Sequence, residues 1–163
     1  MKCLKIAIYA SLSLTSCSQA PFTPAHATEK IDQSNEIKSI YWSDGDSGRI
    51  TLPDGQLIKF RIDDWDAPET GGVGAAVGPA QCELERERGY AAKAFMVNNT
   101  KSGVTFTDNN QRDNVPNRKA LLVHLYVDGA SLIEKAVSKG HLKSWKHDGS
   151  KALEPRPDWC GAP

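Results

Sequence analysis

The sequence lacks the ligand spacings of a zinc site, since it contains neither C-x-x-C nor H-x-x-x-H. It also lacks an excess of charge, because 20 basic and 20 acidic residues balance over its 163 positions. Lys2 and Lys5 lie in an N-terminal stretch without acidic residues, so the rest of the chain is slightly acidic. This balance counts against a protein that coats DNA non-specifically, and it leaves open an enzyme with a local cationic pocket.

No apolar run is long enough to serve as a permanent membrane-spanning helix. Residues 6–15 form a short apolar stretch after a positive start, and Ala25-His26-Ala27 follows as a typical cleavage site, so residues 1–27 fit an export signal. Leu14-Thr15-Ser16-Cys17 also resembles a bacterial lipobox, which would place cleavage before Cys17 and a lipid anchor on that cysteine. We expect an exported protein that is periplasmic, secreted or lipid-anchored; the alternative is a disordered N-terminus.

Four cysteines are present, and export would remove two of them from the folded domain. Cys3 leaves with the signal, and Cys17 is either lipidated or also removed. Cys82 and Cys160 remain as an even pair in an oxidising compartment, where disulfides persist. A disulfide between them would join the C-terminal tail to the loop before the first helix, and the alternative is two unrelated thiols.

Composition divides the chain into a short tether, one domain and a tail. The tether continues to about residue 35 and is rich in Ser, Thr, Pro, Gln and Asn, as flexible linkers are. The folded domain is expected over residues 36–147, a length that can enclose one core. Residues 148–163 contain three prolines and are expected to form an irregular tail.

Apolar patterns within the domain predict an α+β fold. Strands are predicted at 37–42, 49–52, 57–62, 104–107 and 120–127. Helices are predicted at 83–99, with an apolar face that includes Ala91, Ala94 and Phe95, and after Ser131, which forms a capping-box pattern with Glu134. This order of elements fits a five-stranded barrel of the OB type with packed helices.

Four local clusters carry the charged residues of interest. They are Asp44-Gly45-Asp46-Ser47-Gly48, Phe60-Arg61-Ile62, Asp66-Ala67-Pro68-Glu69-Thr70 and Asp113-Asn114-Val115-Pro116-Asn117-Arg118. Each one alone has an ordinary explanation as a turn, a helix cap or a solvated side chain. Together they offer the groups that phosphodiester hydrolysis requires, because a hard cation with oxygen ligands offsets the charge that develops on the phosphate.

Asp46 and Asp66 offer two carboxylates on neighbouring loops, and the backbone carbonyl of Ala67 offers a third oxygen, so a Ca²⁺ site is expected there. Arg61 and Arg118 are candidates to bind phosphate oxygens in bidentate fashion. If Arg118 does not reach the site, the site rests on one arginine alone or on another such as Arg112.

Glu69 is close enough in sequence to the expected metal site to orient or deprotonate the attacking water. Trp145 lies after the second predicted helix and fits either stacking on a base or packing in the core.

The order of these clusters resembles the thermonuclease (staphylococcal-nuclease-like) family, whose motifs are Asp-Gly-Asp-Thr, Phe-Arg-Leu, Asp-x-Pro-Glu and Asp-x-Tyr-Gly-Arg. The likeness extends from residue 37 to residue 145. It departs at Ser47, which replaces Thr, and at Val115-Pro116-Asn117, which replaces the Tyr-Gly with one extra residue.

The resemblance implies an OB-type barrel with about three helices and a calcium-dependent nuclease that cleaves DNA, RNA or both. It implies that Asp46 and Asp66 hold one Ca²⁺, that Glu69 acts on water, and that Arg61 and Arg118 bind the phosphate. Nucleic acid would be the substrate, and we expect a monomer without a stable protein partner. The alternative is a non-catalytic OB module of the cell envelope that binds nucleic acid or a protein.

Overall fold

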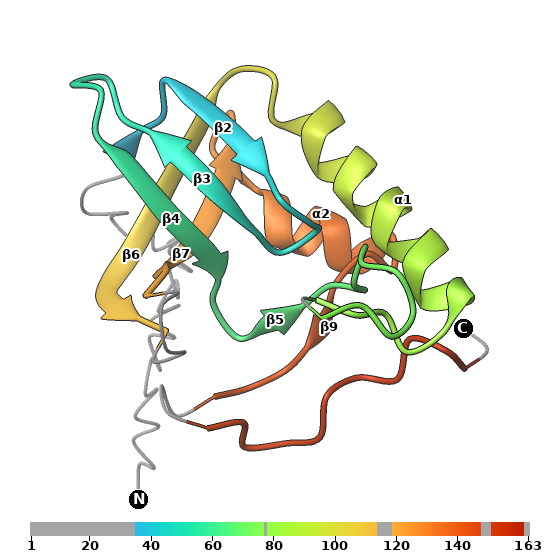
Figure 1. Cartoon of the computed structure of the whole chain (residues 1–163). Helices are drawn as coiled ribbons and strands as arrows, with labels where there is room; N and C mark the ends of the chain where they lie inside the picture. Colours follow the sequence, from blue (N-terminus) through green and yellow to red (C-terminus); the bar gives the residue numbers. More distant parts are fainter. Residues whose placement is uncertain (1–34, 77, 114–118, 148–150, 162–163) are drawn as a thin grey trace, which may run out of the picture. The chain divides into compact units, whose positions relative to one another are not determined.

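The computed structural model describes residues 35–76, 78–113, 119–147 and 151–161 (Figure 1). The expected export signal, Cys17 and Arg118 lie outside the described residues. Within the described part, none of the helices combines the length and the apolar character that crossing a membrane would take.

A mixed sheet of seven strands forms the body of the domain (Figure 1). Its order is β1-β6-β7-β4-β3-β2, with β8 beside β7, and β4 and β7 run parallel while the other pairs are antiparallel. The strands are β1 (Asn35–Glu36), β2 (Ser39–Trp42), β3 (Ser47–Thr51), β4 (Leu57–Ile62), β6 (Val104–Arg112), β7 (Leu121–Val127) and β8 (Ala130–Ser131).

The two residues between β1 and β2 hydrogen-bond to β6 and to β3. Ile37 N–H donates to the carbonyl of Val104 at 3.3 Å, and Lys38 N–H donates to the carbonyl of Thr51 at 2.9 Å. The α+β class is therefore confirmed, whereas the five-stranded barrel is not, because the strands form a mixed seven-stranded sheet.

Two helices, rather than the expected three, occur in the described residues: α1 (Glu83–Asn99) and α2 (Leu132–Ser138). The predicted cap of α2 is confirmed, because the Ser131 hydroxyl accepts the N–H of Glu134 at 3.2 Å. Both pack on the sheet over a core whose largest buried side chains are Trp42, Phe60, Phe106, Ile50, Ile62, Met96, Leu125 and Leu132.

The apolar face predicted for α1 is confirmed only in part, because, of the residues named for it, Phe95 alone packs against the core cluster. Ala91 and Ala94 are exposed, and the helix buries Glu85, Gly89, Ala92 and Met96 instead. These four positions follow one helical stripe, but its first half holds a glycine and a glutamate because it faces a polar loop.

The predicted disulfide between Cys82 and Cys160 is confirmed, with a Cα–Cα distance of 6.1 Å. The two residues are 78 apart in the sequence, so the bond ties the tail to the start of α1. In Figure 1 residues 151–161, drawn in red, run toward this first turn of α1. The tail is irregular, as expected, with one bridge between His147 and Ala152.

A short strand pair that the sequence did not reveal forms a second sheet of two strands. β5 (Trp65–Asp66) pairs antiparallel with β9 (Lys143–Ser144), and Asp66 lies opposite Lys143. The pair is continued by a hydrogen bond from Trp145 N–H to the carbonyl of Asp64 at 2.9 Å. Residues 143–145 are thereby held beside residues 64–66.

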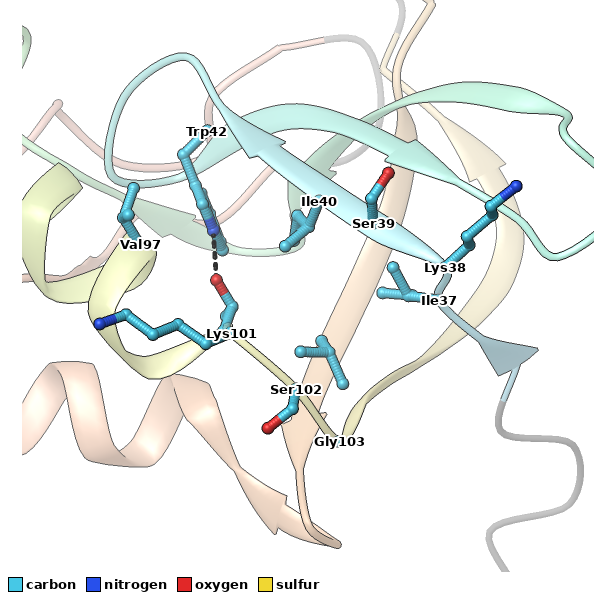
Figure 2. Close-up of a pocket in the computed structure, with 11 residues that line it drawn as sticks. Ile37, Lys38, Ser39, Ile40, Trp42, Val97, Lys101, Ser102 and Gly103 are labelled. Carbon is cyan, nitrogen blue, oxygen red and sulfur yellow. Dashed lines mark hydrogen bonds between the residues drawn. The ribbon is translucent and has the colours of Figure 1, made fainter.

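The opposite end of α1 borders a separate pocket between residues 37–42 and 97–104 (Figure 2). There the indole N–H of Trp42 donates to the hydroxyl of Thr100 at 2.9 Å. Glu85, in the first turn of α1, lies roughly 20 Å away along the helix axis, given a rise of about 1.5 Å per residue.

Candidate functional site

The Asp44–Ser47 turn directs the carboxylate of Asp46 into the domain. Asp44 Oδ1 accepts the backbone N–H groups of Asp46 at 3.1 Å and Ser47 at 2.8 Å, which fixes the turn. Gly45 is required by packing, since a Cβ there would lie 2.7 Å from the Cβ of Ala67. The first aspartate of the motif therefore shapes the turn, and the second, only 3% exposed, faces the site.

Arg61 joins the two predicted metal-binding aspartates. Its Nη2 lies 2.9 Å from Asp46 Oδ2 and 3.5 Å from Asp66 Oδ1, while its Nη1 donates to Asp46 Oδ1 at 3.3 Å. The backbone N–H of Ala67 also donates to Asp46 Oδ2 at 3.2 Å. Four of the predicted site residues, from three separate loops or strand ends, thus come together.

Burial makes the carboxylates of this site depend on nearby positive charge. Asp66 is 1% exposed, and Asp46 is almost as deeply buried. Burial raises the pKa of Asp46 well above its usual range, and the positive charge of Arg61 opposes this rise. Burial also raises the pKa of Glu69, with Arg156 opposing. A further cation at the site would favour the ionised forms.

Glu69 lies on a loop that is held against the first turns of α1. Glu85, 1% exposed, accepts the N–H of Glu69 at 3.3 Å and the N–H of Gln81 at 2.7 Å. Gly89 allows the close approach, because a Cβ there would lie 2.8 Å from the carbonyl oxygen of Pro68. The helix thereby sets the position of the predicted water-orienting residue.

Two residues of the tail, Arg156 and Trp159, also enter the site, and sequence reasoning missed both. Arg156 Nε donates to both carboxylate oxygens of Asp66, at 3.4 Å and 3.2 Å. The indole N–H of Trp159 donates to Asp66 Oδ2 at 2.8 Å. The predicted disulfide at Cys160 could have revealed them, because it brings the residues before Cys160 to the start of α1.

Trp145 packs beside the site and is not part of the core cluster. The Arg61 guanidinium carbon lies 5.8 Å from the centre of its ring, and its indole N–H donates to the carbonyl of Glu154 at 3.1 Å. Of the two expected roles, core packing is therefore wrong, and stacking on a base stays a prediction.

The loop that contains Arg118 begins and ends at a paired position. Asp113 N–H donates to the carbonyl of Ala120, and Ala120 N–H donates to Asp113 Oδ1, both at 2.9 Å. The next residue, Leu121, lies opposite Phe60 in the sheet, so the loop ends beside the strand that carries Arg61. Arg118 itself lies outside the described residues, and its role stays a prediction.

Arg112, the substitute for Arg118, donates from Nη1 to the carbonyl of Lys119 at 3.1 Å. That bond belongs to the base of the loop and not to the cluster around Asp46 and Asp66. The described contacts therefore give Arg112 no place at the site.

The charge of the cluster fits a divalent cation. Four carboxylates, those of Asp46, Asp66, Glu69 and Glu85, face two guanidinium groups, those of Arg61 and Arg156. The carbonyl of Ala67 lies in the same cluster, where it accepts a bond from Arg156 at 3.3 Å. Hard oxygen donors with a surplus of negative charge are the ligands that calcium prefers, and calcium at this cluster stays a prediction.

Across the described ranges, no three His, Cys, Asp or Glu side chains converge as a metal-binding group. The expected calcium site has only two such side chains, and its third ligand is a backbone carbonyl. The absence of a three-residue group therefore does not test it, and the calcium site stays a prediction. Comparison with known proteins finds no family model and no curated protein that matches this chain.

Proposed function

We propose that this protein is a calcium-dependent nuclease that hydrolyses phosphodiester bonds of DNA, RNA or both. The observation that carries the proposal is the contact of Arg61 with both Asp46 and Asp66, at 2.9 Å and 3.5 Å. Three motifs that are separate in the sequence thereby place two carboxylates next to one guanidinium group. Enzymes that transfer or hydrolyse phosphoryl groups use carboxylates to hold a metal ion and guanidinium groups to bind phosphate.

The proposed roles follow from the chemistry of each group. Asp46, Asp66 and the carbonyl of Ala67 would hold the calcium ion, which supplies positive charge against the phosphate oxygens when bound. Arg61, with Arg118, binds the phosphate and stabilises the charge that grows in the transition state. Glu69 orients water or takes its proton, and its raised pKa brings it closer to neutral pH, where a general base is efficient.

We further propose that the domain is of the thermonuclease type, with an OB-like arrangement. The order β2-β3-β4-β7-β6 with a parallel β4–β7 pair supports this, as does the bonding of residues 37 and 38 to β6 and β3. Export to the periplasm, to the medium or to a lipid anchor at Cys17 is proposed from the N-terminal pattern, and the Cys82–Cys160 disulfide is compatible with an oxidising compartment.

The test is digestion of labelled single-stranded DNA and RNA by the purified monomeric protein, with calcium or with excess chelator. We expect cleavage in calcium, none in chelator, and loss of cleavage in Glu69→Gln. The matched control is Glu83→Gln, at an exposed position of α1 outside the cluster. Full activity in chelator would overturn the calcium requirement, and absence of cleavage on both substrates would favour the alternative of a non-catalytic binding module.

A further inference from the structure

The C-terminal tail delivers a second guanidinium to the site, that of Arg156. Its Nη2 lies 3.0 Å from Glu85 Oε1 and 3.5 Å from Glu69 Oε1, and donates to the carbonyl of Ala67 at 3.3 Å. Its Nε bonds both oxygens of Asp66. Every one of these partners belongs to the cluster described above, so Arg156 is part of the site and not a solvated tail residue.

Contacts of the neighbouring tail residues fix the position of Arg156. The disulfide at Cys160 follows it by four residues, and Trp159 between them bonds Asp66. Lys143 donates from Nζ to the carbonyl of Asp158 at 2.7 Å, which joins the tail to β9. Such fixed donors cost little reorganisation when a charged ligand binds.

Arg156 and Arg61 approach the same carboxylate oxygen. Arg61 Nη2 and Arg156 Nε lie 3.5 Å and 3.4 Å from Asp66 Oδ1. The two guanidinium groups are therefore close enough to share one phosphate. Among the described residues, the bonds of Arg156 use only Nε and Nη2, and 21% of its side chain is exposed, against 13% for Arg61.

We propose that Arg156 is a phosphate-binding arginine of this site, which acts with Arg61 on the same phosphodiester. The inference rests on the proposed nuclease function and adds a residue to it. Bidentate guanidinium contacts match the geometry of phosphate oxygens, and a second one offsets more of the charge that develops on them. The Cys82–Cys160 disulfide then serves catalysis indirectly, because it holds the segment that carries Arg156.

Arg156→Lys is the first variant, since lysine keeps the positive charge beside Glu85 and loses the planar fork. We expect its kcat on a single-stranded oligonucleotide in calcium to fall roughly a hundredfold, with its melting temperature near that of the wild type. Arg88→Lys is the matched control, because Arg88 donates to carbonyls of the same tail, those of Trp159 and Gly161, outside the cluster. Its turnover should stay within a few-fold of wild type.

Arg156→Ala leaves the buried Glu85 without its cation and is destabilising for that reason alone. The double variant Arg156→Ala with Glu85→Gln removes the charge imbalance, and Glu85→Gln alone is its reference. We expect the double variant to bind thymidine 5′-monophosphate roughly tenfold more weakly than that reference by calorimetry, in calcium and in chelator.

Three outcomes would overturn the role of Arg156. Wild-type turnover in Arg156→Lys means that its charge serves only the fold. Faster cleavage or tighter calcium binding on its removal means that the tail opposes the metal. Unchanged nucleotide binding in the double variant means that Arg156 does not touch the phosphate. If the wild type itself cleaves nothing, the nuclease proposal fails separately, and the calorimetry still decides whether Arg156 binds phosphate.

Discussion

The indole N–H of Trp159 donates a hydrogen bond to Oδ2 of Asp66 at 2.8 Å, across 93 residues of sequence. Both groups are buried, so water does not replace the bond when it is lost. Through this contact the C-terminal tail helps to hold Asp66, a predicted metal ligand, in position.

Trp159→Phe removes this donor and keeps an aromatic ring. We expect the free energy of unfolding in urea to fall by about 1–3 kcal/mol, the cost of leaving a buried acceptor with one fewer partner. Trp42→Phe is the matched control, because it loses the bond to Thr100 at the other end of α1. Both variants should lose stability, but only Trp159→Phe should change calcium affinity; an unchanged affinity there would contradict the account.

The disulfide predicts that the protein denatured without reductant shows no titratable thiol from Cys82 or Cys160. Reduction should lower the free energy of unfolding by up to about 4 kcal/mol, since the bond closes a long loop. The double variant Cys82→Ser with Cys160→Ser should be as unstable as the reduced protein and insensitive to reductant. Two free thiols in the unreduced protein would rule the bond out.

Calcium should stabilise the fold as well as support cleavage. At a calcium concentration about 100 times the Kd, the free energy of unfolding should rise by about 2.7 kcal/mol, which thermal denaturation detects. Asp46→Asn should abolish this gain, whereas Asp54→Asn, in the exposed β3–β4 turn, should keep it. If calcium raised the free energy of unfolding of Asp46→Asn by the same amount, Asp46 would not be a calcium ligand.

Gly89→Ala tests the close approach of α1 to the Glu69 loop. The added methyl group would lie 2.8 Å from the Pro68 carbonyl oxygen, so the loop must shift. We expect a loss of about 1–3 kcal/mol in the free energy of unfolding, together with slower cleavage. Gly72→Ala is the control, since nothing lies within 4 Å of a Cβ at that position. Equal stability of the two variants would show that the approach is not required.

Local sequence patterns were sufficient to predict the helices and strands that have a clear periodicity or a clear capping residue. The strand Leu57–Ile62 and the helix Glu83–Asn99 were predicted with the bounds that the structure has, because turn residues and glycines delimit them. The convergence of Asp46, Arg61 and Asp66 also agrees with expectation, since their motifs follow neighbouring strand ends.

Long-range contacts account for what the sequence did not reveal. β5 and β9 have two residues each, too few for any periodicity, and they exist because two segments far apart in the sequence pair with each other. Glu85 looks like an ordinary first-turn glutamate until Arg156 and the Glu69 loop are in place around it. The exposure of Ala91 and Ala94 was missed for the same reason, because part of the buried face of α1 meets polar backbone.

The rate of oligonucleotide cleavage by Arg61→Lys tests the central claim most directly, because Arg61 connects both aspartates. Arg49→Lys, exposed on the neighbouring strand beside the ring of Tyr41, is the control. The account predicts that kcat in calcium falls by roughly a hundredfold or more in Arg61→Lys, the scale of losing one preorganised donor, and stays unchanged in Arg49→Lys. A folded Arg61→Lys protein with wild-type turnover would contradict it.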